Sequence, residues 1–138
     1  MSHRLNGFWI ILALGILLTA CSRPSVSQYD WPCWRGPDGN GISSETGWNP
    51  KALEGGPHIV WKAAVGTGYS NVAIQDNRLY TMGFGENNSI YCLNANTGKI
   101  LWEYSYESYY PPQATPTVEG TSVYCLNREE TLFCLAGC

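Results

Sequence analysis

Side chains suited to acid–base or nucleophilic chemistry are scarce in this chain. Apart from His3 near the start, the only histidine is His58, and it follows a Gly-Gly-Pro run that is typical of a loop. Asp30 and Asp38 flank a Trp-Arg-Gly-Pro segment, where acids are usually solvated turn residues. No Gly-x-Ser-x-Gly motif is present. A base–nucleophile pair cannot be assembled from these residues, so we assign no catalytic residue and do not expect an enzyme.

Cysteine is the one reactive residue type that is well represented, with six copies. Cys21 directly follows an apolar run and stands apart from the rest. The other five are an odd number, so at least one of them must stay unpaired within the chain. None of them has the Cys-x-x-Cys spacing of a zinc site, and the sequence indicates no metal ligands. Pairing stays open among Cys33, Cys92, Cys125, Cys134 and Cys138.

Residues 1–20 predict an export signal. A short polar start with His3 and Arg4 precedes eleven uncharged residues at 8–18, a run too short for a bilayer span of about 20 residues. Residues 18–21 read Leu-Thr-Ala-Cys and resemble the lipobox of bacterial lipoproteins. That resemblance implies a signal peptide over 1–20, with Cys21 diacylated at its sulfur and becoming the new N-terminus. The alternative is an ordinary signal followed by a chance cysteine.

The lipobox resemblance also implies a location. The lipidated, palmitate-bearing chain would be held at the cell envelope. Ser22 stands where an aspartate would favour the inner membrane, so we expect the outer membrane, facing the periplasm. Residues 21–30 are polar and without periodicity, as in a flexible tether. The formal net charge of -3 argues against nucleic acid, so the expected partners are the membrane and other envelope proteins.

The rest of the chain contains an internal repeat. Cys92 and Cys134 lie 42 positions apart, and Trp61 and Trp102 lie 41 apart. The short segments 72–75, 78–83, 89–94 and 99–106 are rich in Ile, Leu, Tyr, Trp and Val, and turn-forming residues separate them. No helical periodicity occurs. Four short strands in about 40 to 45 residues are typical of one β-propeller blade, so the fold class is all-β.

Three segments resemble the PQQ-like β-propeller repeat proteins. Residues 89–102 read SIYCLNANTGKILW, residues 114–124 read ATPTVEGTSVY, and residues 30–37 read DWPCWRGP. The resemblance implies a lead-in over 31–57 and partial repeats over 58–138. The repeats would comprise a strand at 59–65, a complete blade at 70–106 and an incomplete blade at 114–138. Because the second unit has no fourth strand, we expect the chain to be the N-terminal part of a longer propeller.

The resemblance gives three residues structural roles. Gly98 would supply the positive φ of the turn between the third and fourth strands. Trp102, on the outermost strand, would dock against the turn of a neighbouring blade. Trp61 would do the same from the blade that closes the ring. An aromatic cluster follows the turn and precedes two prolines: Tyr104, Tyr106, Tyr109 and Tyr110. It has two interpretations. The tyrosines form a partner-binding surface, or they are strand residues followed by a connecting loop.

Two functions of different class remain. One is a membrane-anchored, non-catalytic scaffold or binding module of the cell envelope. The other is the N-terminal part of a PQQ-dependent quinoprotein dehydrogenase. Enzymes of that kind hold PQQ against a disulfide between adjacent cysteines, near calcium. No Cys-Cys pair occurs here, and no calcium ligands can be matched. We therefore expect neither PQQ nor calcium in this chain, except under the second hypothesis.

Overall fold

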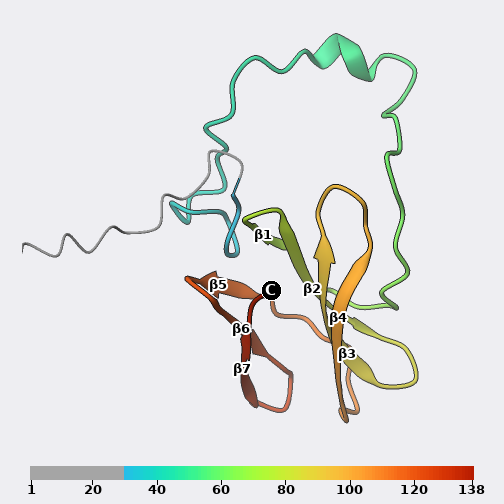
Figure 1. Ribbon diagram of the computed structural model, residues 1–138, viewed down its shortest axis with the longest axis vertical. Helices are drawn as coiled ribbons and strands as arrows, with labels where there is room; N and C mark the ends of the chain where they lie inside the picture. Colours follow the sequence, from blue (N-terminus) through green and yellow to red (C-terminus); the bar gives the residue numbers. More distant parts are fainter. Residues whose placement is uncertain (1–29) are drawn as a thin grey trace, which may run out of the picture.

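The computed structural model describes residues 30–138, and these residues form two antiparallel β-sheets (Figure 1). Helical structure in this part of the chain is limited to one short 3-10 turn, η1 (Pro50–Leu53). The predicted all-β fold class, with one complete four-stranded unit and one incomplete unit, is confirmed. The predicted signal over 1–20, the lipidation of Cys21 and nearly all of the tether lie outside the described residues.

The first sheet has four strands in the order β1-β2-β3-β4, so each strand pairs with its neighbour in sequence. Asp76 and Asn77 connect the first two strands with φ values of 50° and 62°, as a two-residue hairpin turn requires. The ends of these strands differ by only one residue from those expected from the sequence. The strands are β1 (Ala73–Gln75), β2 (Arg78–Phe84), β3 (Asn88–Asn94) and β4 (Ile100–Tyr106).

The second sheet has three strands in the order β5-β6-β7. They are β5 (Thr117–Glu119), β6 (Ser122–Leu126) and β7 (Leu132–Ala136). Strand β7 repeats the position of β3, because Cys134 follows Cys92 by one repeat length. Within the described residues β7 pairs only with β6 and forms an edge of its sheet.

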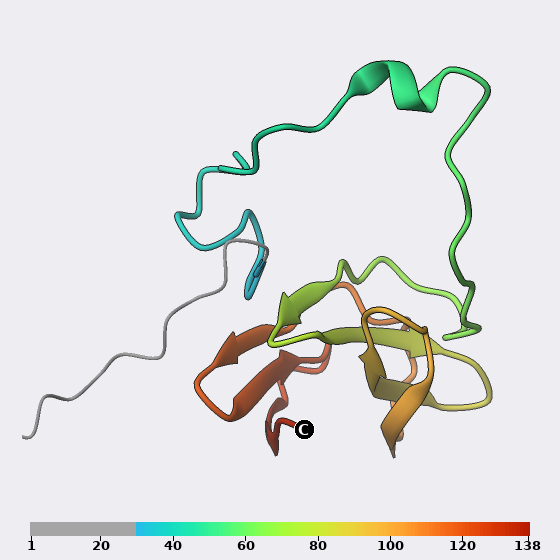
Figure 2. The ribbon, with the colours of Figure 1, turned by 45° about the horizontal axis from the view of Figure 1, so that its top comes forward.

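A single hydrophobic core joins the two sheets. The sheets lie next to each other, with β1 and β5 in contact (Figure 2). Trp102 and Tyr106 of the first sheet and Phe133 and Leu135 of the second pack against the buried cluster from both sides. The buried members come from β1, β2, β3, β5 and β6: Ala73, Tyr80, Met82, Ile90, Cys92, Val118, Val123 and Cys125.

The lead-in forms backbone hydrogen bonds with the first strand of each sheet, β1 and β5. Trp31 exchanges two backbone hydrogen bonds with Ile74 of β1, at 2.8 and 2.9 Å, and the Val118 amide of β5 donates to the Pro32 carbonyl at 2.8 Å. A short extended segment therefore binds both sheets at once. Asp30 is buried, and its Oδ1 accepts a hydrogen bond from the Asp76 amide at 3.2 Å. The expectation that Asp30 is a solvated turn residue was wrong, because the lead-in places it over the β1–β2 turn.

The predicted strand at 59–65 is absent. These residues are extended and mostly exposed, and no neighbouring strand among residues 30–138 offers them a hydrogen-bonding ladder. They end a long connection that arches away from the sheets, from the lead-in to β1 (Figure 1). Pairing begins only at Thr67, which forms an isolated bridge with Phe84. The apolar composition of 59–65 indicated a strand, but a strand also needs a partner.

Candidate binding surface between the blades

The connection before β1 is attached to the first sheet by Trp61. The indole N–H of Trp61 donates to the Ala95 carbonyl at 3.0 Å. The indole ring lies on Gly98, where φ is 69° and a Cβ atom would come within 2.4 Å of the ring. The turn below the ring is held by the Asn94 side chain, which accepts hydrogen bonds from the amide and the hydroxyl of Thr97, both at 3.0 Å. Trp61 thus docks on the β3–β4 turn.

Trp102 occupies the corresponding place one repeat later. It is half-buried, pairs with Cys92 in the β3–β4 ladder and packs on Tyr80, with 6.1 Å between ring centroids. Its outer side borders a surface pocket of about 270 Å³ that reaches the end of β7, where Leu135 and Ala136 lie. Trp102 therefore faces the neighbouring sheet.

The four tyrosines after the β3–β4 turn separate into two pairs. Tyr104 and Tyr106 on β4 pack against Phe133 of the second sheet, with ring centroids 5.8 and 4.7 Å apart. They are strand residues in the contact between sheets. Tyr109 and Tyr110 lie beyond β4 and are 93 % and 47 % exposed. We call residues 107–112, which carry this second pair and the two prolines, the inter-blade loop.

The inter-blade loop is held in place from both sheets. From the start of β3, the buried Asn88 side chain donates to the Tyr110 carbonyl at 3.0 Å. From the β6–β7 turn, the Glu129 carboxylate accepts hydrogen bonds from the Ser108 hydroxyl at 2.8 Å and from the Tyr109 amide at 3.0 Å. At the far end, the Tyr69 amide donates to the Pro112 carbonyl at 2.9 Å. The loop is irregular, but its backbone has fixed partners.

These contacts lower the pKa of the Glu129 carboxylate. The Ser108 hydroxyl is the main cause that lowers its pKa from the ordinary value of 4.5, and the Tyr109 amide and the charge of Arg128 act in the same direction. The Arg128 guanidinium also lies over the Tyr110 ring, 4.2 Å from its centroid. The β6–β7 turn therefore presents a carboxylate, from Glu129, and a guanidinium cation, from Arg128, to the inter-blade loop.

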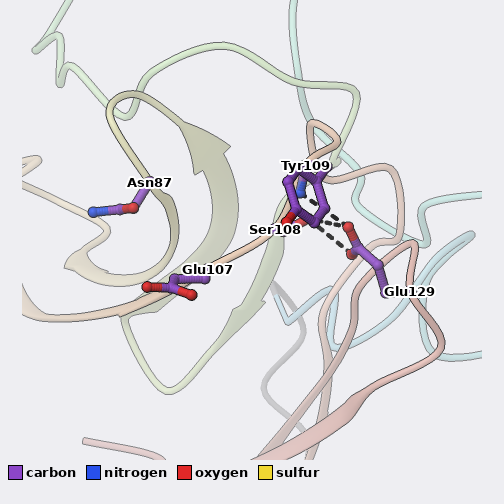
Figure 3. A pocket seen from close by; sticks show the side chains of 5 residues that line it. All are labelled: Asn87, Glu107, Ser108, Tyr109 and Glu129. Carbon is purple, nitrogen blue, oxygen red and sulfur yellow. Dashed lines mark hydrogen bonds between the residues drawn. The ribbon is translucent and has the colours of Figure 1, made fainter.

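A surface pocket of about 410 Å³ lies beside this contact. Figure 3 shows Ser108, Tyr109 and Glu129 joined by hydrogen bonds on one side of the pocket, with Asn87 and Glu107 on the other. Its lining combines one aromatic ring with amide, hydroxyl and carboxylate groups. Such a lining suits a polar ligand or peptide.

The remaining candidates from the sequence do not join this surface. His58 and Asp38 are exposed, in the connection and in the lead-in. Across residues 30–138, no group of three or more His, Cys, Asp or Glu residues could hold a metal ion. Together with the lack of adjacent cysteines, these residues do not fit the calcium and disulfide that hold PQQ in quinoprotein dehydrogenases. No helix in the described part of the chain is long and apolar enough to cross a membrane.

Sequence reasoning did not identify Asn88 or Glu129. Asn88 had a usable signal, since an asparagine at the start of a buried strand must find hydrogen-bond partners. Its Nδ2 found two carbonyls in the inter-blade loop, those of Ser108 and Tyr110. Glu129 had no such signal, because it is one of two consecutive acids in a turn. Only the packing of the second sheet against the first brings it to Ser108.

A comparison with known protein families identifies one family for this chain. The model of the family described as "Outer membrane protein assembly factor BamB" matches residues 51–136, which is more than half of the chain. The match spans the docked Trp61, the complete first sheet, the inter-blade loop and the second sheet. No curated protein matches the chain. With that share of its length matched, the chain belongs to this family of PQQ-like β-propeller repeat proteins.

Proposed function

We propose that this protein is a membrane-anchored, non-catalytic binding module of the cell envelope, and that the inter-blade loop carries its binding surface. The observation that carries this proposal is that Tyr109 combines an exposed side chain with a hydrogen-bonded backbone. Its side chain is 93 % exposed, while its backbone amide is tied to Glu129 of the other sheet. An exposed aromatic side chain on an ordered loop is the arrangement that protein interfaces use for their anchor residues.

Pre-organisation explains why such a loop would bind well. A tyrosine on a free loop loses backbone entropy when a partner immobilises it, roughly 1 to 2 kcal/mol for each residue that becomes ordered. Here Asn88, Glu129 and Tyr69 already hold the backbone of the loop. Little of that cost remains at binding, so the buried aromatic area can appear as affinity.

The family supports a partner of a particular class. Its description names an outer membrane protein assembly factor, and a scaffold that contacts outer-membrane proteins or their assembly partners needs no catalytic group. The proposed anchor is a lipid on Cys21, in the outer membrane facing the periplasm. Several acyl chains on one residue would give stable attachment, where one chain binds only marginally.

Metabolic labelling tests the anchor. Cells that express the full chain are grown with labelled palmitate, and the label in the purified protein is compared with that in Cys21→Ser. We expect label in the parent protein and none in the variant, which should also remain unprocessed. Cys33→Ser is the matched control, since it removes a thiol from the same region and should leave labelling unchanged. Palmitate in Cys21→Ser would contradict the lipidation of Cys21.

Co-purification from detergent-solubilised membranes tests the binding surface. Removal of an interface anchor typically costs 2 kcal/mol or more, about a 30-fold loss of affinity. We therefore expect Tyr109→Ala to lose most of the outer-membrane protein that co-purifies with the parent chain. Val60→Ala is the control, because Val60 is 76 % exposed but lies in the connection before β1. Equal recovery with both variants would remove the inter-blade loop from the proposed function.

A further inference from the structure

Two cysteines from different sheets meet beside the hydroxyl of Tyr80. Cys92 lies on β3 with none of its surface exposed, and it is the direct ladder partner of Tyr80 on β2. Directly opposed residues in a sheet project their side chains from the same face. Cys138 follows β7, and its backbone amide donates to the Tyr80 hydroxyl at 3.4 Å. The second sheet therefore delivers Cys138 to the face that carries Cys92.

The two cysteines flank the Tyr80 hydroxyl, because Cys92 is the ladder partner of Tyr80 and the Cys138 amide donates to that hydroxyl. Burial raises the pKa of the Cys92 thiol to about 12, and the nearby Cys138 thiol acts in the same direction. The Tyr80 hydroxyl acts on the pKa of the Cys92 thiol in the opposite direction. A disulfide between the two cysteines needs a side-chain adjustment that brings the two sulfur atoms to bonding distance, about 2 Å. Cys138 is exposed, so its side chain has room for that adjustment.

The other cysteines are not placed to pair. Cys125 lies opposite Phe133 in the β6–β7 ladder, and Cys134 lies opposite Tyr124. These are adjacent rungs, so the two cysteines project from opposite faces of the sheet. Cys33 is in the lead-in, where its thiol donates to the Gly36 carbonyl at 3.1 Å. Among these five cysteines, Cys92 and Cys138 are the two that meet at one side chain, that of Tyr80.

We propose that Cys92 and Cys138 form a disulfide that joins the first sheet to the end of the second. The bond would close a loop between positions 46 apart in the chain, which contains β4, the inter-blade loop and the whole second sheet. It would fix β7, an edge strand of a three-stranded sheet, to the most buried part of the core. It would thereby limit separation of the two sheets around the inter-blade loop.

The oxidant is a low-molecular-weight disulfide such as oxidised glutathione. The exposed Cys138 thiolate attacks it, which forms a mixed disulfide and releases one reduced glutathione. The Cys92 thiolate then attacks the Cys138 sulfur and releases the second. Two protein thiols lose two electrons and two protons, and one glutathione disulfide becomes two thiols. Because burial disfavours the Cys92 thiolate, the second step should accelerate as pH rises.

Peptide mapping of the full chain in detergent tests this bond. Trypsin leaves Cys92 in residues 79–99, but it leaves Cys134 and Cys138 together in residues 129–138. The experiment therefore uses Cys134→Ser, in which the second peptide contains Cys138 alone. The protein is equilibrated with a glutathione buffer, and the remaining thiols are alkylated at acidic pH in denaturant. We expect mass spectrometry without reduction to find peptides 79–99 and 129–138 linked, and to find them separate after reduction.

Every other outcome counts against the proposal. Alkylated Cys92 together with Cys138 capped by glutathione would show that the second step does not occur. A link from Cys138 to Cys33, Cys125 or a second Cys138 would show that another geometry prevails. Cys138→Ser guards against misfolding, because it alters only an exposed residue. Oxidation should raise the thermal midpoint of the parent protein and leave that of Cys138→Ser unchanged.

Discussion

The indole ring of Trp61 lies directly on Gly98, and the two residues come from segments 37 positions apart in the chain. Gly98 is required there for two reasons. Its φ of 69° suits glycine, and a Cβ atom would come within 2.4 Å of the ring. The contact helps to fix the connection before β1, which forms no strand between 59 and 65, to the first sheet, together with the bridge between Thr67 and Phe84.

A substitution at Gly98 tests this contact. We expect Gly98→Ala to lower the free energy of unfolding by roughly 1 to 3 kcal/mol, because it adds both backbone strain and a clash with Trp61. Gly85→Ala is the control, since Gly85 has no atom within 4 Å of an added Cβ and its φ lies outside the left-handed region. Urea denaturation followed by tryptophan fluorescence measures both. Equal stability of the two variants would show that the docking of Trp61 contributes nothing.

A second prediction concerns the edge strand β7. Leu132 is 64 % exposed, and its ladder partner Leu126 is 45 % exposed. An apolar edge with unpaired backbone groups is a template for pairing with another chain. The chain without residues 1–20, carrying Cys21→Ser and kept reduced, should therefore associate as its concentration rises. Sedimentation velocity measures this association.

A lysine at the edge should suppress the association. We expect Leu132→Lys to sediment with less oligomer than the parent chain at each concentration. Leu53→Lys is matched in chemistry and exposure, since Leu53 is 57 % exposed, but it lies in η1, away from either sheet edge. A parent chain that remains monomeric throughout, or an equal effect of both lysines, would count against association through β7.

The third prediction is a pH dependence of the inter-blade loop. The pKa of Glu129 is lowered from 4.5, chiefly by the Ser108 hydroxyl, so its hydrogen bonds hold the loop while the carboxylate is ionised. Their contribution is present above pH 4.5 and is lost as pH falls through the lowered pKa. The Tyr109 amide shift in an NMR titration should report this change. In Glu129→Gln the transition should vanish, and a midpoint above 4.5 in the parent chain would contradict the assignment.

The fourth prediction concerns PQQ. The described residues offer no cluster for calcium, and the chain has no adjacent cysteines. We therefore expect that purified full chain, mixed with PQQ and calcium and then desalted, retains no quinone absorbance. A quinoprotein dehydrogenase of known stoichiometry serves as the positive control. Retention of one equivalent of quinone would restore the quinoprotein hypothesis.

The strands could be predicted from the sequence because their signals are local. Short apolar runs separated by residues such as Asp76, Asn77 and Gly98 give nearly the observed limits of β1 to β4. The 42-residue spacing of Cys92 and Cys134 likewise indicated β7. The prediction of a strand at 59–65 was wrong, because the composition of this segment suits a strand but strand formation also requires a pairing partner elsewhere in the chain.

The candidate site could be predicted only in part. Tyr109 and Tyr110 stood out by composition, but the same pattern included Tyr104 and Tyr106, which pack on Phe133. The contacts that order the loop depend on how the two sheets meet. Glu129 lies 21 positions after Ser108, and neither local sequence indicates their hydrogen bond. Cys138 lies 46 positions after Cys92, and neither local sequence indicates that both reach Tyr80.

Photo-crosslinking from position 109 tests the proposed binding function most directly. Benzoylphenylalanine replaces Tyr109 in the full chain, and membranes of intact cells are irradiated. The proposal predicts a covalent product between this chain and an outer-membrane protein or its assembly partner, identified by mass spectrometry. The same probe at Val60 should give no such product, since this exposed residue lies away from the inter-blade loop. Products of equal yield from both positions, or none from position 109, would contradict a binding surface at the loop.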